Sequence, residues 1–331
     1  MPSHSHRLCF AGTQAPVTVY KVTLRKPTLE CIAKVVGRGW AADAEVSAHS
    51  ALCQVPATRV VPLERPPTTL SCGRRVLFMR PLDQGFGKDN TFASFCRHAA
   101  DLFDVSGWCV SLCLSVSLCA SLCVTLCAYA RLRASVRVAM SRVHRFGVQL
   151  PQALHAWHLE RWVHCDIKPS NMGVDAAGGL FLFDLGLAMQ LPQHEQPVRM
   201  GGPVGTHGYM APEVEDPARG HAFSYAADVY SACASVLQLL RGLQKVLAQA
   251  LGWCAARASM VLTCWRVQAA KARSSDARER AEPLPVAQLK RLKKLMKKGM
   301  QPQPADRPAP RAIANTIRGL AAAAASAKGI K

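Results

Sequence analysis

The sequence predicts an α+β protein with a small strand-rich amino-terminal part and a larger, mainly helical part after it. Residues 17–22 alternate apolar and polar side chains, and residues 29–36 form a second run typical of strands. Later in the chain, apolar side chains recur at helical spacing in residues 150–163 and again in residues 286–300. The chain has 331 residues, half of them hydrophobic, so it can bury a sizeable core.

One short segment carries most of the chemical information. Residues 162–171 read Trp-Val-His-Cys-Asp-Ile-Lys-Pro-Ser-Asn, and the triplet Asp-Leu-Gly follows at 184–186. Phosphoryl transfer needs a group that orients a hydroxyl, a cation that steadies the transferring phosphate, and oxygen ligands for metal ions. The residues that match these needs, in chain order, are Asp166, Lys168, Asn171 and Asp184.

The segment resembles the catalytic loop of the eukaryotic protein kinase superfamily, which reads His-Arg-Asp-Leu-Lys-Pro-x-Asn and is followed by Asp-Phe-Gly. Three further landmarks occur in the family's order. Residues 205–213 match the end of an activation loop, and residues 228–231 resemble the start of the buried helix beneath the catalytic site. The triplet Asp-Arg-Pro at 306–308 resembles the late motif whose Arg, here Arg307, pairs with the Glu of Ala-Pro-Glu, here Glu213.

This resemblance implies a bilobal kinase-like fold that transfers the γ-phosphate of ATP to a protein hydroxyl, with ATP and Mg²⁺ as cofactors. Asp166 would position the acceptor hydroxyl, Lys168 would steady the phosphate, and Asn171 and Asp184 would bind both ATP and Mg²⁺. Lys168, together with Gly205-Thr206, resembles the serine/threonine branch, so we expect Ser or Thr acceptors in protein substrates. Small-molecule phosphotransferases share the architecture but lack the Ala-Pro-Glu closure and its downstream Arg.

The amino-terminal part contains the candidate nucleotide site. Lys34 follows Val19 at a spacing close to the family's separation between the Gly-rich strand and the Val-Ala-Ile-Lys lysine, so both are candidate ATP ligands. Glu45, in a helix expected over residues 41–52, is the candidate ion-pair partner of Lys34, although their separation is short for the family. The alternative interpretations are a solvated strand lysine and an ordinary exposed helix acid.

The Gly-rich loop departs from the family pattern. Its alignment onto residues 12–19 keeps Gly12, a candidate ATP ligand, but places Gln14 and Val17 where the family has glycines. Glycine lets backbone amides approach a phosphate without a Cβ in the way. We therefore expect weaker nucleotide binding or a loop that is held differently.

Residues 76–82 are expected to form a strand that runs into the hinge, with Phe78 near the back of the adenine pocket and Met79 among the ATP-binding residues. Together these features divide the chain into four parts. They are an amino-terminal lobe with hinge (1–82), an insertion and connection (83–149), a carboxyl-terminal lobe (150–320) and a frayed tail (321–331).

Part of the insertion does not resemble a kinase. No charge occurs between Asp104 and Arg131, and Ser-Leu-Cys recurs at 111, 117 and 121. The stretch is long enough to span a bilayer, but a span there would place two halves of one active site on opposite sides of a membrane, so a membrane helix is not expected. Its regular Cys spacing also admits a thiolate metal site, and its low complexity admits a retained intron.

The chain is strongly basic, with 41 Lys and Arg against 21 Asp and Glu. This charge favours acidic partners without selecting among them, and specific binding of nucleic acid or membrane is not expected. Residues 286–300 read as a basic amphipathic helix, in the first place a lobe helix with a solvated face, with nuclear import or an anionic partner as alternatives. No signal-peptide-like run occurs in residues 1–30, so a cytoplasmic or nuclear location is expected.

Two absences bear on regulation. Kinases that are switched by loop phosphorylation usually carry an Arg before the catalytic Asp, and this chain has Cys165 there. Residues 187–205 contain no Ser, Thr or Tyr. The sequence therefore predicts activity that does not depend on phosphorylation of this loop. The alternative function is a pseudokinase that acts as a binding or scaffold module, which the missing glycines and the insertion favour.

Overall fold

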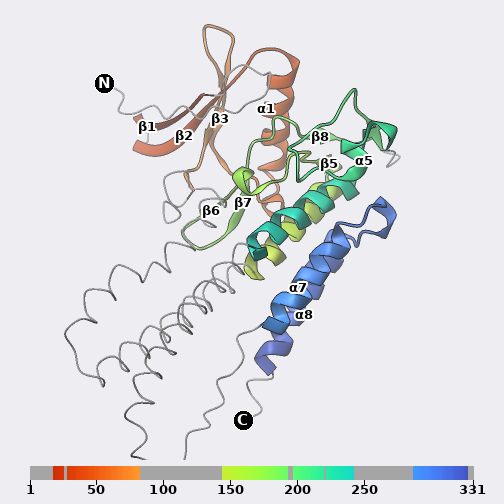
Figure 1. Cartoon of the computed structure of the whole chain (residues 1–331). Coiled ribbons are helices and arrows are strands. Elements are labelled where there is room, and N and C mark those ends of the chain that lie inside the picture. The colour runs from red at the N-terminus through yellow and green to blue at the C-terminus, as the bar shows by residue number, and fades with distance from the viewer. Residues whose placement is uncertain are drawn as a thin grey trace, which may run out of the picture.

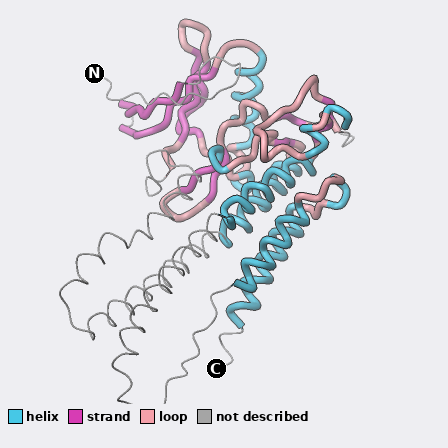
Figure 2. Tube along the Cα trace, in the orientation of Figure 1, coloured by secondary structure: helices cyan, strands magenta, loops and turns pink. Residues whose placement is uncertain are grey.

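The computed structural model describes residues 18–25, 28–82, 144–192, 197–219, 221–241 and 286–326. Gly12 and the low-complexity stretch from 104 to 131 lie outside these residues. Figures 1 and 2 show the longer strands gathered at one end of the molecule, with α1 beside them, and the longer helices packed together below. The predicted α+β organisation, with a strand-rich part followed by a helical part, is confirmed.

The amino-terminal part is a four-stranded antiparallel sheet in the order β1-β2-β4-β3. Its strands are β1 (Thr18–Arg25), β2 (Thr28–Val36), β3 (Leu63–Thr69) and β4 (Arg75–Met79). The predicted strand over 76–82 ends at Met79, so the residues after it are not part of the sheet. The unpredicted strand β3 contains two prolines and lies at the edge of the sheet, where a missing N–H leaves no ladder bond unmade.

Helix α1 (Trp40–Leu52) follows β2 after a connection of only three residues, 37–39. Gly39 has φ 83°, a left-handed conformation that suits glycine at the point where the chain turns into the helix. Ala42 and Val46 face the sheet and pack in one apolar cluster with Val36 and Leu77. This cluster fixes α1 against the inner face of the sheet.

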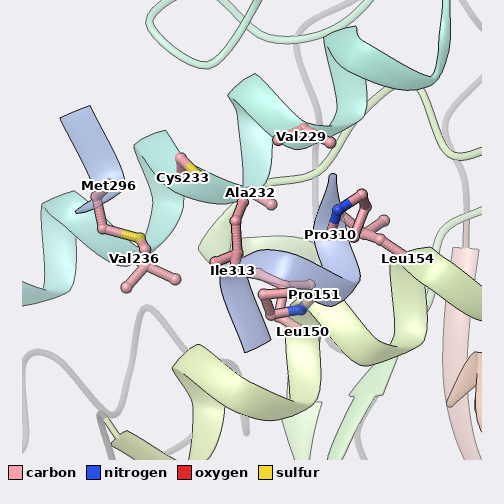
Figure 3. A pocket seen from close by; sticks show the side chains of 10 residues that line it. All are labelled: Leu150, Pro151, Leu154, Val229, Ala232, Cys233, Val236, Met296, Pro310 and Ile313. Carbon is pink, nitrogen blue, oxygen red and sulfur yellow. The ribbon is translucent and has the colours of Figure 1, made fainter. Parts of the chain in front are cut away.

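The carboxyl-terminal part is built on helices at 144–159 and 225–241, α7 (Val286–Gly299) and α8 (Pro310–Ser326). Figure 3 shows their apolar side chains converging, with Leu150, Cys233, Met296 and Ile313 coming from four different helices. α7 lies so close to helix 225–241 that a Cβ at Gly299 would meet the Cys233 sulfur at 2.2 Å. The core of the molecule lies where these helices meet.

Helices in this part extend across the sequence-based boundaries, or end before them. The helix that contains Leu150 already covers residue 144, so it crosses the boundary predicted between 149 and 150. Val163, predicted on that helix, lies in a strand because the helix ends at 159. The predicted tail from 321 is helical as far as Ser326, since α8 continues through its alanine-rich end.

Short strands and turns order the loops that lie outside the main sheet and the long helices. Three two-stranded ladders pair β5 (Trp162–Val163) with β8 (Met189–Gln190), β6 (Met172–Val174) with β7 (Leu180–Leu182), and β9 (Val198–Arg199) with β10 (Ala222–Phe223). The single-turn helix α5 covers Pro212–Glu215. Short 3-10 turns cover Pro56–Thr58, Pro169–Asn171, Pro217–Arg219 and Pro304–Asp306.

The segment between α1 and β3 joins the two parts. Val60 forms a parallel bridge with Leu182 of β7, and the Leu182 N–H donates to the Arg59 carbonyl at 2.7 Å. The indole Nε1 of Trp157 donates to the Thr58 carbonyl at 2.9 Å. These contacts place β7, and the acidic residue that follows it, beside α1. Among the helices in the described ranges, none is long and apolar enough to cross a membrane.

Candidate active site

Asp166 lies on the loop between β5 and β6 and is almost fully buried. Lys168 Nζ lies 2.7 Å from its Oδ2, Asn171 Nδ2 donates to the same oxygen at 3.0 Å, and Thr206 Oγ1 donates to Oδ1 at 2.6 Å. Lys168 Nζ also donates to Thr206 Oγ1 at 2.8 Å. The Asp166 carboxylate is therefore held by three side chains, one of which comes from the end of the activation segment.

A second buried acid holds the backbone of this loop. The carboxylate of Asp228 accepts the N–H of His164 at 2.7 Å and that of Cys165 at 3.0 Å. Burial raises the pKa of Asp228 to about 7, against the lowering effect of these two bonds. Cys165 has φ 66°, so the loop turns through a left-handed residue immediately before Asp166.

His164 anchors the loop through its backbone. Neither nitrogen of its ring has a hydrogen-bond partner in the part of the chain that the structure describes. Its ring instead stacks on Trp157, with centroids 5.2 Å apart. The backbone N–H of His164, bonded to Asp228, does the bracing.

Lys34 links two acids from different parts of the chain. Its Nζ lies 2.5 Å from Glu45 Oε1 and 2.6 Å from Asp184 Oδ1. Burial alone would lower the pKa of Lys34, but the two carboxylates raise it above its ordinary value. Burial would likewise raise the pKa of Asp184, but the adjacent ammonium of Lys34 lowers it. Lys34 and Asp184 are thus held in their charged forms.

The short separation of Lys34 and Glu45 follows from the local structure. β2 ends at Val36 and α1 begins at Trp40, so Glu45 already lies in the second turn of the helix and faces the strand. The expected ion pair is present, and the alternative of a solvated lysine beside an exposed acid is wrong, because both side chains are less than a tenth exposed.

The apolar ATP-site candidates lie on the same sheet. Val19 on β1 is the direct cross-strand neighbour of Lys34, and Met79 at the end of β4 is the neighbour of Ile32. Residues two apart on a strand point to the same face, so Ile32 and Lys34 share a face. Val19 and Met79 thus lie on the two strands that flank β2, the strand of Lys34, and their role in ATP binding stays a prediction.

The residues proposed for Mg²⁺ fit a hard, oxygen-binding cation. Asn171 Oδ1 is buried and has no hydrogen-bond partner within the described residues. The Phe183 N–H donates to the Asn171 carbonyl at 3.1 Å. Asp184 directly follows Phe183, so this bond keeps the backbones of Asn171 and Asp184 close together. Amide and carboxylate oxygens are the ligands that Mg²⁺ prefers, so Asn171 and Asp184 would hold it. The ion would neutralise charge on the transferring phosphate.

No group of three or more His, Cys, Asp or Glu side chains suited to a metal occurs in the ranges that the structure describes. A cation at Asn171 and Asp184 would therefore complete its coordination with oxygens of the nucleotide or water, as is usual for Mg²⁺. The thiolate site that the regular Cys spacing admits falls outside the described residues.

The activation segment is fixed at both ends. This segment runs from Asp184 to Glu213, and near its start β8 pairs with β5. At its other end, Glu213 of α5 forms a buried bidentate ion pair with Arg307, with both N–O distances 2.6 Å. The pair predicted from the late motif is therefore present. Between these ends, Leu191 of the segment packs in an apolar cluster with Cys165 of the catalytic loop, Val214 and other buried side chains.

Thr206 is the site residue whose position the sequence did not predict. Its hydroxyl donates to the Asp166 carboxylate and accepts from Lys168 Nζ. A signal for it exists, because Thr206 is the first hydroxyl-bearing residue after Asp184. Gly12, the remaining candidate ATP ligand, lies outside the described residues.

The geometry agrees with comparisons to known proteins. The protein kinase domain family matches residues 113–317, more than half of the chain, and the match begins inside the region predicted as an insertion. The chain is 33% identical over 101 residues to G protein-coupled receptor kinase 1 of Caenorhabditis elegans, covering 30% of this chain and 15% of that protein. It is 39% identical over 97 residues to the mitosis inhibitor protein kinase mik1 of Schizosaccharomyces pombe, covering 29% and 16%.

A third relative is human mitogen-activated protein kinase kinase kinase 4, 31% identical over 102 residues, which cover 30% of this chain and 6% of that protein. The matched stretch thus spans less than a fifth of the length of each of these three relatives. The family match extends over both the catalytic loop and the Glu213–Arg307 pair. The chain belongs to the protein kinase domain family.

Proposed function

We propose that this chain transfers the γ-phosphate of ATP to Ser or Thr hydroxyls of protein substrates, with Mg²⁺ as cofactor. The observation that carries this proposal is the convergence of two acids around one site. Lys168 donates to Asp166 at 2.7 Å and Asn171 donates to it at 3.0 Å. The Asn171 carbonyl in turn accepts the N–H of Phe183, the residue before Asp184, at 3.1 Å. Transfer of a phosphoryl group depends chiefly on such positioning and on electrostatic stabilisation.

Each residue has a definite task in this proposal. Asp166 accepts the hydrogen bond of the substrate hydroxyl and orients its oxygen towards the γ-phosphate. Lys168, 2.7 Å from Asp166, places a positive charge where negative charge develops on the phosphate. Lys34, which Glu45 holds in place, binds the α and β phosphates, and Val19 and Met79 contact the base.

Ser or Thr as the acceptor is the finer part of the proposal. Lys168 and Thr206 bond to each other and to Asp166, so the space beside the carboxylate is bounded by a lysine and a hydroxyl. This arrangement suits a short aliphatic hydroxyl that must reach Asp166. Mixtures of Ser, Thr and Tyr peptides, compared as acceptors, test this preference.

We further propose that activity does not require phosphorylation of the activation segment. Cys165 occupies the place of the Arg that pairs with a loop phosphate, and it is buried in an apolar cluster that includes Leu191, Val214 and Phe223. Packing of this kind orders the segment without a phosphate. Mass spectrometry of active protein before and after phosphatase treatment tests this, and a large loss of activity on dephosphorylation within 187–213 would refute it.

The central test measures transfer of radiolabelled phosphate from ATP in the presence of Mg²⁺. The natural chain is expected to label protein substrate, whereas Asp166→Asn and Asp184→Asn should lose at least about 100-fold in rate. Glu30→Gln, which neutralises an exposed carboxylate on β2, should leave the rate unchanged. Equal signal from all the variants would mean a contaminating kinase and would refute the proposal.

A pseudokinase that acts as a scaffold is the second candidate. It is favoured by Gln14 and Val17, which stand where the family has phosphate-binding glycines. In that case, the chain would bind Mg²⁺-ATP, or no nucleotide, without transferring phosphate. Titration of a fluorescent ATP analogue beside the transfer assay separates the two functions.

A further inference from the structure

His49 is a buried imidazole on the same face of α1 as Glu45. The two residues are four apart in the helix, so their side chains lie one turn from each other on one face. His49 is 1% exposed, and its Nε2 lies 2.7 Å from the carbonyl oxygen of Val61. A histidine at this place has no assigned task in the site described above.

The direction of this hydrogen bond is determined by chemistry. A carbonyl oxygen can only accept, so Nε2 of His49 carries a proton and donates to Val61. Burial, together with the positive charge of Lys34 nearby, lowers the pKa of His49 to about 4, against the raising effect of the hydrogen bond to Val61. The imidazole is therefore neutral at physiological pH, with its single N–H on Nε2.

Val61 continues this connection to the acidic residue on the other side of the site. Its N–H donates to the Leu182 carbonyl at 3.1 Å, and Leu182 is the last residue of β7, two before Asp184. A hydrogen-bonded path thus runs from α1 through Val61 to β7. Lys34 makes a parallel connection, from Glu45 of α1 to Asp184, two residues after the end of β7.

The segment that receives the His49 bond is itself firmly held. Thr58 Oγ1 donates to the Leu52 carbonyl at 2.7 Å, which closes the turn after α1. Trp157 Nε1 donates to the Thr58 carbonyl, and Thr58 is fully buried. Val61, three residues on, is therefore a fixed reference point against which α1 can be oriented.

We propose that His49 is a positioning residue that fixes the rotation of α1, so that Glu45 holds Lys34 against Asp184. Apolar packing of Ala42 and Val46 holds α1 against the sheet, and an exposed ion pair joins Asp43 to Arg75 of β4. The His49 bond adds a buried, directional contact one turn from Glu45, and so restricts the rotation of the helix at the point where Glu45 meets Lys34. The consequence for phosphate transfer rests on the proposed function, but the effect on the position of Lys34 does not.

The test measures how fast acetic anhydride acetylates Lys34 in the intact chain, by peptide mass spectrometry. In the natural protein the Lys34 side chain is 7% exposed and doubly ion-paired, so it should react slowly. His49→Leu removes the donor. Because a lost hydrogen bond changes a local equilibrium by roughly tenfold, Lys34 should be released more often and its acetylation rate should rise about tenfold. His49→Gln, whose amide nitrogen can replace Nε2, should keep the rate near that of the natural protein.

Three controls define the result. Glu45→Gln breaks the pair with Glu45 directly and gives the rate of a Lys34 that keeps only Asp184 as its partner, while acetylation of exposed Lys290 calibrates the reagent. His158→Leu makes the same change at another histidine whose Nε2 is buried, and should leave Lys34 protected. Thermal unfolding shows whether each variant is folded. If His49→Leu is not, His49→Asn replaces it, because its amide is one methylene too short to reach Val61.

Protection of Lys34 that is lost in His49→Leu and kept in His49→Gln supports the proposal. Equal protection in both variants overturns it, and so does equal loss in both, since packing rather than the hydrogen bond would then set the position. Phosphate transfer by the natural chain is measured in parallel. Its absence would count against the proposed function and would leave the acetylation result standing.

Discussion

At the scale of single residues, Thr206 holds two of the groups on which the proposed transfer depends. Its hydroxyl donates to Asp166 and accepts from Lys168, so it is the shared partner of the proposed base and cation. Hydrogen bonds to charged groups contribute about 1.5–3 kcal/mol each. Thr206→Val, which keeps the shape and removes the hydroxyl, should therefore lower kcat by about 10- to 100-fold at saturating ATP.

Thr206→Ser is the matched control, since it keeps the hydroxyl and removes only a methyl group. Most of the activity should survive in this variant. Initial rates of peptide phosphorylation give the comparison, and equal kcat values for the Ser and Val variants would show that the hydroxyl does not position Asp166 and Lys168.

The low pKa of His49 predicts how the free energy of unfolding changes with pH. The folded protein keeps this imidazole neutral down to a pKa of about 4, while the unfolded chain takes up a proton below about pH 6.5. The folded state therefore loses stability as the pH falls from 6.5 towards 4, by up to about 3 kcal/mol from this one residue. His49→Gln removes this contribution and should flatten the decline.

Urea unfolding of both proteins at pH 7 and pH 4.5 measures the difference. Other titrating groups, including Asp228, whose raised pKa acts in the opposite direction, are common to both proteins and cancel in the comparison. The same loss of stability on acidification in both proteins would mean that His49 is protonated in the folded state.

At the scale of elements, the Glu213–Arg307 pair ties the end of the activation segment to the segment before α8. Both side chains are buried, and Arg307 also donates to the backbone carbonyls of Gln301 and Ala226. Removing one partner of a buried pair leaves an uncompensated charge and costs about 3–5 kcal/mol. Arg307→Leu should therefore lower the free energy of unfolding by about this amount.

The double variant Arg307→Leu with Glu213→Leu should recover part of the loss, because no buried charge is left unpaired. Arg219→Leu is the control on a partly exposed pair with Asp216, where a loss below about 1 kcal/mol is expected. Chemical denaturation measures all four proteins. Equal losses for Arg307→Leu and Arg219→Leu would show that burial adds nothing to the first pair.

The elements also show what sequence patterns predict and what they miss. β1, β2 and α1 are close to their predicted positions because alternation and helical spacing are local properties. β3 was missed because its two prolines are typical of non-strand segments, and only the order of the sheet reveals that it is an edge. Short elements defined by their pairing partners, such as β9 and β10, carry no local signal at all.

At the scale of the whole molecule, contacts between residues close in sequence could be predicted, and contacts between distant residues could not. Asp166, Lys168 and Asn171 lie within six residues of one another, so a single turn of chain brings them together and their motif predicts the contact. The bond between Trp157 and Thr58 joins residues 99 apart, and nothing in either neighbourhood identifies the partner. Long-range polar bonds such as this one depend on how the two parts of the molecule pack.

The Trp157–Thr58 bond therefore gives the prediction for the molecule as a whole. Because it joins the helix at 144–159 to the segment between α1 and β3, it couples unfolding of the amino-terminal sheet to unfolding of the helical core. Trp157→Phe removes the N–H, keeps an aromatic ring, and leaves a buried carbonyl without this donor, at a cost of about 1–3 kcal/mol. The loss falls on the junction, so the amino-terminal sheet should unfold first.

Two buried cysteines report on the two parts separately, Cys31 on β2 and Cys233 on helix 225–241. Thiol labelling in increasing urea, resolved by peptide mass spectrometry, should show both labelled together in the natural protein. In Trp157→Phe, Cys31 should be labelled at lower urea than Cys233, whereas Trp162→Phe, the same change on β5, should keep the two together. Coincident labelling in Trp157→Phe would mean that the other bonds across the junction, between Leu182 and the Arg59–Val61 segment, couple the two parts without it.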